Sequence, residues 1–214
     1  MRLNKFLADN TELSRRKADT AIENGRIAIN GQRAVLGTTV EAGDKVSIDG
    51  VAIQAKETKI ITVLLNKPVG YVCSRDGQGS KTIYDLLPAS YTSLNIAGRL
   101  DKDSSGLVVL TNDGKLLHEL THPANDKEKV YNVSIDKTLW PEDRHKLLTG
   151  VDIEDDRPSK FKRIKKISDK SYEVVLTEGR NRQIRRTFEV LGYKVTQLSR
   201  VQLGRFRLGK IKEK

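Results

Sequence analysis

The sequence predicts an α+β protein with a small N-terminal unit and a larger, strand-rich unit. Apolar residues near the N-terminus have helical spacing, Asn30-Gly31 marks a tight hairpin, and several later segments have the length and β-branched composition of strands. A polar segment, Gln54–Thr58, separates the two regions and has the composition of a short linker. We therefore expect one domain at residues 1–56 and a second at residues 57–214.

The first fifty residues have the pattern of two amphipathic helices followed by strands. Leu3 and Leu7 fall on one face of the first helix. Ser14 is suited to cap the second helix, which should end near Gly25. Residues 26–29 then alternate as a strand does and lead into the hairpin turn.

A basic cluster, Arg15, Arg16 and Lys17, lies in the first turn of the second predicted helix. Positive side chains there oppose the positive end of the helix dipole. Contact with the phosphates of a nucleic acid is one explanation for such a placement. A solvated basic turn is the other.

The most informative stretch, Ala97–Gly114, places a carboxylate on a loop directly before a buried strand. Residues 98–101 are turn-prone and end at Asp101, and residues 107–110 (LVVL) form an apolar run of strand length. Rigid scaffolds often present reactive groups on such loops, which makes Asp101 a candidate catalytic residue. Because an aspartate in a turn commonly caps nearby backbone N–H groups, the spacing alone leaves both interpretations open.

Helices and strands are also predicted in the rest of the second region. Residues 60–65 and 129–135 have the pattern of strands, and Tyr131 shares a face with Val133 and Ile135, which favours core packing. The remaining predicted segments are short helices at Thr82–Pro88 and around Leu116–Leu120, a helix with a turn at Trp140–Gly150, an exposed acidic segment at Val151–Arg157, a half-buried strand at Lys160–Ile167 with a hairpin partner at Tyr172–Leu176, and strands at Val195–Val201 and Arg205–Ile211.

A last helix is predicted near residue 184. Ile184, Phe188 and Leu191 form one buried stripe, and Gly192 is suited to terminate the helix. Four basic side chains crowd its start: Arg180, Arg182, Arg185 and Arg186.

Composition limits the function classes. Residues 157–214 carry 18 Lys or Arg against 5 Asp or Glu, within a net charge of +11 for the whole chain, so a polyanion is the expected partner. Nucleic acid is favoured over an anionic membrane surface, because the basic segment alternates as strands do instead of forming one amphipathic helix. A single cysteine, Cys73, excludes an internal disulfide. It also leaves no Cys/His set with zinc spacing, and His118 and His122 alone are too few ligands, so no metal is expected. No apolar run is long enough to span a membrane and we find no signal peptide, so a cytoplasmic protein is expected.

Four motifs resemble known families. GRLDKDSSGLVVLTN at residues 98–112, NKPVGY at 66–71, KVY at 129–131 and EGRNRQIRR at 178–186 are together similar to the RsuA-like pseudouridine synthases, which isomerise uridines in bacterial ribosomal RNA. The segments SRR, GRIAING and GDKVSIDG in the first fifty residues resemble an S4 RNA-binding domain. The resemblance implies a mixed, mainly antiparallel sheet with flanking helices behind the S4 domain.

The resemblance also implies site residues. Asp101 would attack the ribose C1′ or abstract a ribose proton, Tyr131 would stack on the flipped uracil, and Arg185 would pair with Asp101. RNA contacts would come from the S4 domain and from arginines near the active site: Arg2, Lys5, Ser14, Arg15, Arg16, Lys17, Arg26, Asn30, Arg99, Arg180, Arg182 and Arg186. No cofactor is implied, because the isomerisation is redox-neutral.

The implied partner is ribosomal RNA, from a large-subunit precursor or assembly intermediate, bound by a monomer that does not associate with membranes. Two alternatives stay open. One is a non-catalytic, S4-containing RNA-binding factor, and the other is the same chemistry on small-subunit ribosomal RNA or transfer RNA.

Overall fold

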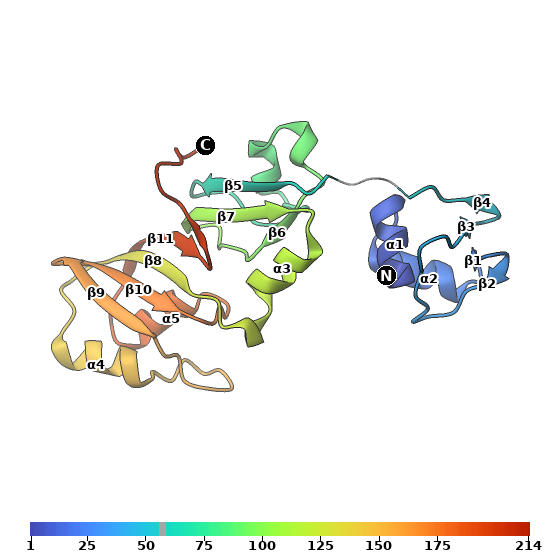
Figure 1. Ribbon diagram of the computed structural model, residues 1–214. Helices are drawn as coiled ribbons and strands as arrows, with labels where there is room; N and C mark the ends of the chain where they lie inside the picture. Colours follow the sequence, from blue (N-terminus) through green and yellow to red (C-terminus); the bar gives the residue numbers. More distant parts are fainter. Residues whose placement is uncertain (56–58) are drawn as a thin grey trace. The chain divides into compact units, whose positions relative to one another are not determined.

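The computed structural model describes residues 1–55 and 59–214, and the chain divides into two compact units, Met1–Lys59 and Ile60–Lys214 (Figure 1). Each unit has a hydrophobic core of its own. The domain boundary predicted between residues 56 and 57 lies outside the described residues, as does most of the predicted linker.

Two helices and a small sheet make up the first unit. Helices α1 (Leu3–Asn10) and α2 (Arg15–Glu23) share a core with a four-stranded sheet of order β2-β1-β3-β4. Its strands are β1 (Ile27–Ile29), β2 (Gln32–Arg33), β3 (Val46–Ile48) and β4 (Val51–Ala52). The Ser14 hydroxyl accepts a hydrogen bond of 3.3 Å from the Lys17 backbone N–H, which confirms the predicted cap.

The predicted hairpin is also present in the first unit. Asn30 and Gly31 have φ values of 51° and 80°, and Ile29 pairs with Gln32 across the turn. A two-residue turn in a hairpin needs positive φ at both positions, which asparagine and glycine tolerate best.

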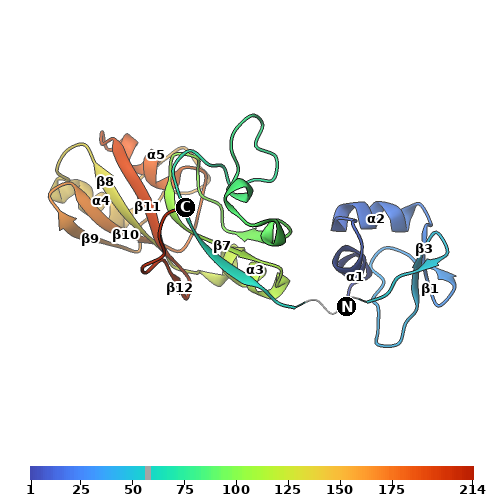
Figure 2. The same ribbon diagram turned by 90° about the horizontal axis from the view of Figure 1, so that it is seen from above.

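An eight-stranded mixed sheet dominates the second unit (Figure 2). Its main path is β5-β7-β11-β8-β10-β9, while β6 pairs with β7 and β12 pairs with β11. The strands are β5 (Thr62–Lys67), β6 (Asn95–Ala97), β7 (Ser105–Thr111), β8 (Lys129–Ile135), β9 (Arg163–Ser168), β10 (Ser171–Leu176), β11 (Val195–Leu203) and β12 (Phe206–Arg207). Of these pairings, β7 with β11 is parallel and the others are antiparallel, which confirms the expected mixed sheet.

Strand β7 is buried on both faces. Val108 and Leu110 belong to the main core, whereas Leu107 and Val109 belong to a second core that includes residues of α3. All four side chains are fully buried. Burial on both faces explains why this strand is a continuous apolar run rather than an alternating one.

Helices flank this sheet. Helix α3 (Gly114–Thr121) packs on β6 and β7, α4 (Pro141–Thr149) on β9, and α5 (Gln183–Val190) on β11. Short 3₁₀ helices are η1 (Ile83–Leu86), η2 (Ala89–Tyr91) and η3 (Pro123–Asn125). No helix within residues 1–55 or 59–214 combines the length and apolar composition needed to cross a bilayer.

Three predicted segments differ from the structure. The strand predicted at Arg205–Ile211 is reduced to the two residues of β12, Phe206–Arg207. The segment Val151–Arg157 is not simply exposed, because Val151 and Ile153 are buried in the main core. Strand β9 begins at Arg163 rather than Lys160, and Ile164 is its one buried residue. The alternation predicted there is incomplete because Ile167 remains 56% exposed.

Candidate active site

Asp101 lies on the loop that joins β6 to β7. Its backbone carbonyl accepts a hydrogen bond of 3.1 Å from the Ser104 N–H, which closes a tight turn. The side chain is half-buried. Among residues 1–55 and 59–214, no group donates a hydrogen bond to this carboxylate or forms an ion pair with it, so it is available to a ligand.

Asp101 and Tyr131 line one cavity of about 290 Å³ in the second unit. Tyr131 comes from β8, and its side chain is buried on the same face as Val133 and Ile135, as predicted. The exposed Arg99 lies at the same cavity. The structure therefore brings together a free carboxylate, an aromatic ring and a cation from two separate motifs.

Arg185 is placed differently from the expectation that it pairs with Asp101. Its Nε lies 3.2 Å from Asp103 Oδ2, and its Nη2 donates to the backbone carbonyl of Asp103 at 2.7 Å. It is also not among the residues that line the cavity in the described part of the chain. Asp101 and Asp103 lie on one loop two residues apart, so sequence spacing could not decide between the two carboxylates.

Asp103 also binds Arg182, which lines the cavity. Two parallel hydrogen bonds of 3.0 Å join the Arg182 guanidinium to the two oxygens of Asp103. Burial alone would raise the pKa of Asp103, but the Arg182 hydrogen bonds and the charges of both arginines outweigh it and lower that pKa. Sequence reasoning did not single out Asp103, although its position in the central motif was the available signal.

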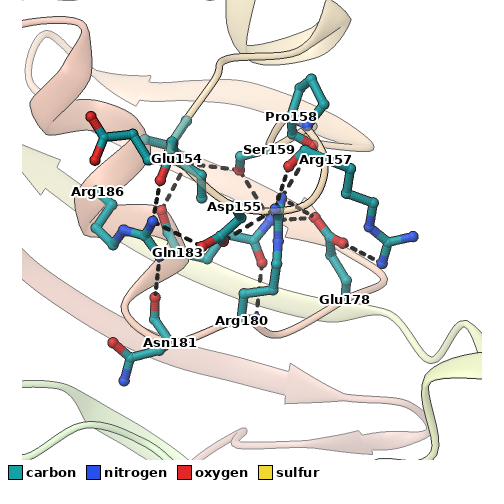
Figure 3. A network of polar contacts seen from close by, with 12 residues as sticks. Glu154, Asp155, Arg157, Pro158, Ser159, Glu178, Arg180, Asn181, Gln183 and Arg186 are labelled. Atoms are coloured by element: carbon teal, nitrogen blue, oxygen red, sulfur yellow. Dashed lines mark hydrogen bonds and ion pairs between the residues drawn. The ribbon is translucent and has the colours of Figure 1, made fainter.

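The remaining arginines of the last motif, Arg180 and Arg186, which were predicted to contact RNA, bind protein groups (Figure 3). Arg180 forms ion pairs with Asp155 at 3.2 Å and Glu178 at 2.9 Å. Arg186 pairs with the other oxygen of Asp155 at 3.0 Å and donates to the Ile153 carbonyl. Asp155 thus bridges the two arginines, which explains why the acidic segment around it packs against the protein.

Two buried cations near the Asp101 loop were not predicted. Lys67 is fully buried, and its Nζ donates to the backbone carbonyls of Ser104 at 2.6 Å and Pro68 at 3.0 Å. Burial lowers the pKa of Lys67. Arg200, from β11, is 1% exposed and lines the cavity.

In the first unit, the predicted RNA-binding residues divide into two groups. Arg15, Arg16 and Lys17 are exposed, and within residues 1–55 and 59–214 their side chains have no hydrogen-bond or ion-pair partner. The others contact protein groups: Arg2 with the Gly37 carbonyl, Lys5 with Asp9, Ser14 with the Lys17 N–H, Arg26 with Asp49, and Asn30 with Asp44. The cluster at the start of α2 is therefore the group of cations best able to contact phosphate.

Comparison with known proteins defines the class. A family model described as RNA pseudouridylate synthase matches residues 61–190, and a model described as S4 domain matches residues 1–46. The chain therefore belongs to the RNA pseudouridylate synthases, a family of isomerases, and carries an S4 domain at its N-terminal end.

Individual relatives agree with this class. The dual-specificity RNA pseudouridine synthase RluF of Salmonella typhi is 40% identical over 203 residues, which cover 94% of this chain and 70% of that protein. The ribosomal large subunit pseudouridine synthase B of the same organism is 40% identical over 220 residues, covering 98% and 75% respectively. A crystal structure of a pseudouridylate synthase superimposes with a TM-score of 0.72 at 31% identity, covering 100% of this chain and 93% of that one.

Proposed function

We propose that this protein converts uridine to pseudouridine in large-subunit ribosomal RNA and that Asp101 is its catalytic residue. The observation that carries the proposal is the Asp101 carboxylate, which lies unpaired in the cavity that Tyr131 also lines. A residue that only capped its own turn would direct its carboxylate to backbone N–H groups instead.

The chemistry fits these groups. The C1′–N1 bond of the uridine breaks, the uracil turns within the cavity, and a C1′–C5 bond forms. C5 then loses its proton and N1, no longer bonded to the ribose, takes one up, so the product is an isomer of the substrate. Asp101 either attacks C1′ or removes a ribose proton, and the geometry is compatible with both routes. A base stacked inside RNA cannot reach this loop, so the nucleotide has to be flipped into the cavity, where the ring of Tyr131 can stack on it.

Ribosomal RNA is the proposed substrate for two reasons. The relative named ribosomal large subunit pseudouridine synthase B covers nearly the whole chain, and the free cations at the start of α2 form a phosphate-binding surface on the S4 domain. We further propose that the protein acts as a cytoplasmic monomer on a large-subunit precursor or assembly intermediate, without a cofactor.

The test measures tritium release from large-subunit ribosomal RNA labelled at uridine C5. Asp101→Asn is nearly isosteric, so we expect the rate to fall by at least about a hundred-fold, the scale of lost acid–base catalysis, while the Kd for RNA stays within about three-fold. Asp156→Asn, a change at an exposed carboxylate, is the matched control and should leave the rate unchanged.

Three results would contradict the proposal. Tritium release by Asp101→Asn at the wild-type rate would exclude Asp101 as the catalytic residue. Wild-type release from small-subunit ribosomal RNA or transfer RNA alone would reassign the substrate. Binding without release from any RNA would favour a non-catalytic RNA-binding factor.

A further inference from the structure

Arg200 is a buried cation that has no anionic partner in the part of the chain that the structure describes. Its side chain is 1% exposed, and within residues 1–55 and 59–214 no carboxylate lies close enough to form an ion pair with it. Placing a charge in a protein interior without a counterion is costly, and an apolar side chain of similar volume is often the more stable choice. Stability alone therefore does not account for an arginine at this position.

The hydrogen bonds of Arg200 have a specific arrangement. Its Nη2 donates to the Gly98 carbonyl at 2.8 Å and its Nη1 to the Arg99 carbonyl at 3.4 Å. Its Nε donates to the Leu107 carbonyl at 2.9 Å. Gly98 and Arg99 precede Asp101, and Leu107 follows it on β7, so one guanidinium holds both ends of the catalytic loop.

The direction of the Asp101 carboxylate depends on this loop. No side chain in the described part of the chain bonds to that carboxylate, and Arg185 binds Asp103 instead. The backbone alone therefore orients Asp101. A rigid guanidinium fork with several donors in one plane is well suited to fix a backbone in this way.

Arg200 also connects the loop to the position of Tyr131. The two residues face each other across the antiparallel pair β8–β11. On the other side of β11, Arg200 is the partner of Gly106 in the parallel pairing of β11 with β7. Arg200 thus lies where the strand that carries Tyr131 and the strand that follows Asp101 both meet β11.

We propose that Arg200 is a positioning residue for the isomerisation, holding the Asp101 loop at a fixed distance and direction from Tyr131. This inference rests on the proposed function. Reactions in enclosed sites are sensitive to displacements of about 1 Å, which can cost about a hundred-fold in rate. Loosening the loop should therefore reduce turnover much more than it reduces RNA binding.

The experiment compares Arg200→Met, Arg200→Lys and the control Arg207→Met, which removes the same charge from an exposed site on β12. Tritium release gives kcat and KM, and circular dichroism with thermal unfolding gives the folded fraction. We expect Arg200→Met to lower kcat per folded molecule by about a hundred-fold, with KM and the Kd for RNA within about three-fold. Arg200→Lys should lower kcat similarly, because an ammonium group is a point charge that cannot hold both ends of the loop.

The outcomes separate this inference from the proposed function. If the wild type releases no tritium, the proposed function itself fails. If the wild type is active and either Arg200 variant keeps its kcat within about three-fold, Arg200 is not a positioning residue. The inference would also be overturned if the variants changed KM alone, or if kcat fell only in proportion to the folded fraction. Because Arg200→Lys keeps the charge, it provides a second folded variant should Arg200→Met fail to fold.

Discussion

Replacing Asp155 with asparagine tests the polar network that holds the last arginine-rich motif (Figure 3). Asp155 accepts from Arg180 through one oxygen and from Arg186 through the other, at 3.2 Å and 3.0 Å. The three side chains are 22%, 15% and 30% exposed respectively. In the variant, one guanidinium would face an amide NH₂ group, which cannot accept its hydrogen bond.

The expected cost follows from these contacts. A hydrogen bond to a charged group contributes about 1.5–3 kcal/mol, and the variant loses one such bond and weakens the other. Arg180 retains Glu178, and Arg186 retains the Ile153 carbonyl, so neither cation becomes fully unpaired. We therefore expect the free energy of unfolding of the second unit to fall by about 2 kcal/mol, which corresponds to about 4–8 °C in Tm for a unit of this size.

Urea unfolding followed by fluorescence measures this cost. Trp140 is the one tryptophan in the sequence and lies in the second unit, so its signal reports on that unit. The matched control is Asp156→Asn, which removes a neighbouring exposed carboxylate. If both variants unfold at the same urea concentration, Asp155 does not stabilise the unit through the two arginines.

Three further changes have defined outcomes. Gly106→Ala should destabilise the second unit by at least about 3 kcal/mol in urea unfolding, because the new Cβ would lie 2.3 Å from the Arg200 carbonyl oxygen. Burial lowers the pKa of Lys67, so above the lowered pKa the unfolded chain binds more protons than the folded chain. This residue therefore makes the free energy of unfolding of the wild type rise with pH towards the ordinary lysine pKa of 10.5. Lys67→Met should remove that rise from unfolding curves measured between about pH 7 and 10. Replacing Arg15 and Arg16 with alanine should weaken binding to ribosomal RNA and reduce the salt slope of log Kd by about 1–2.

Each of these three predictions has a control variant or a result that would contradict it. Gly70, in the same unit, also has positive φ, but a Cβ there meets no atom within 4 Å, so Gly70→Ala reports backbone strain alone. If Gly106→Ala loses no more stability than this control, the close approach of the new Cβ to the Arg200 carbonyl oxygen contributes nothing. If the free energies of unfolding of Lys67→Met and the wild type differ by the same amount at every pH, the lowered pKa of Lys67 does not contribute to stability. An unchanged salt slope in the Arg15 and Arg16 variant would remove α2 from the RNA-binding surface.

The first unit was predictable because its signals are local. A cap at Ser14, the Asn30-Gly31 turn and the apolar faces of α1 and α2 each involve residues a few positions apart. Most strands of the second unit were also predicted from their patterns, although β6 was not. Their order was not, because Ser105 of β7 pairs with Ser199 of β11, and nothing local to either strand specifies that partner.

Buried charges were the part that sequence reasoning missed. Lys67 and Arg200 have the side chains of surface residues, and an alternating pattern gives no reason to place them inside. What allows their burial is a set of backbone carbonyls, most of them supplied by distant segments. The partner of Arg185 was missed for the same reason, since the choice between Asp101 and Asp103 depends on how α5 meets the loop.

Strand β9 forms one end of the main path of the sheet and has a consequence for solubility. The outer edge of such a strand has free N–H and C=O groups that can recruit a strand from another molecule and start aggregation. Arg163, Lys165 and Lys166 are exposed along β9, two of them paired with Glu173 and Asp169, and charged side chains at a sheet edge hinder close approach of a second copy. The basic residues of this strand thus protect a concentrated solution of the protein against edge-to-edge fibre growth, whatever they contribute to contacts with RNA.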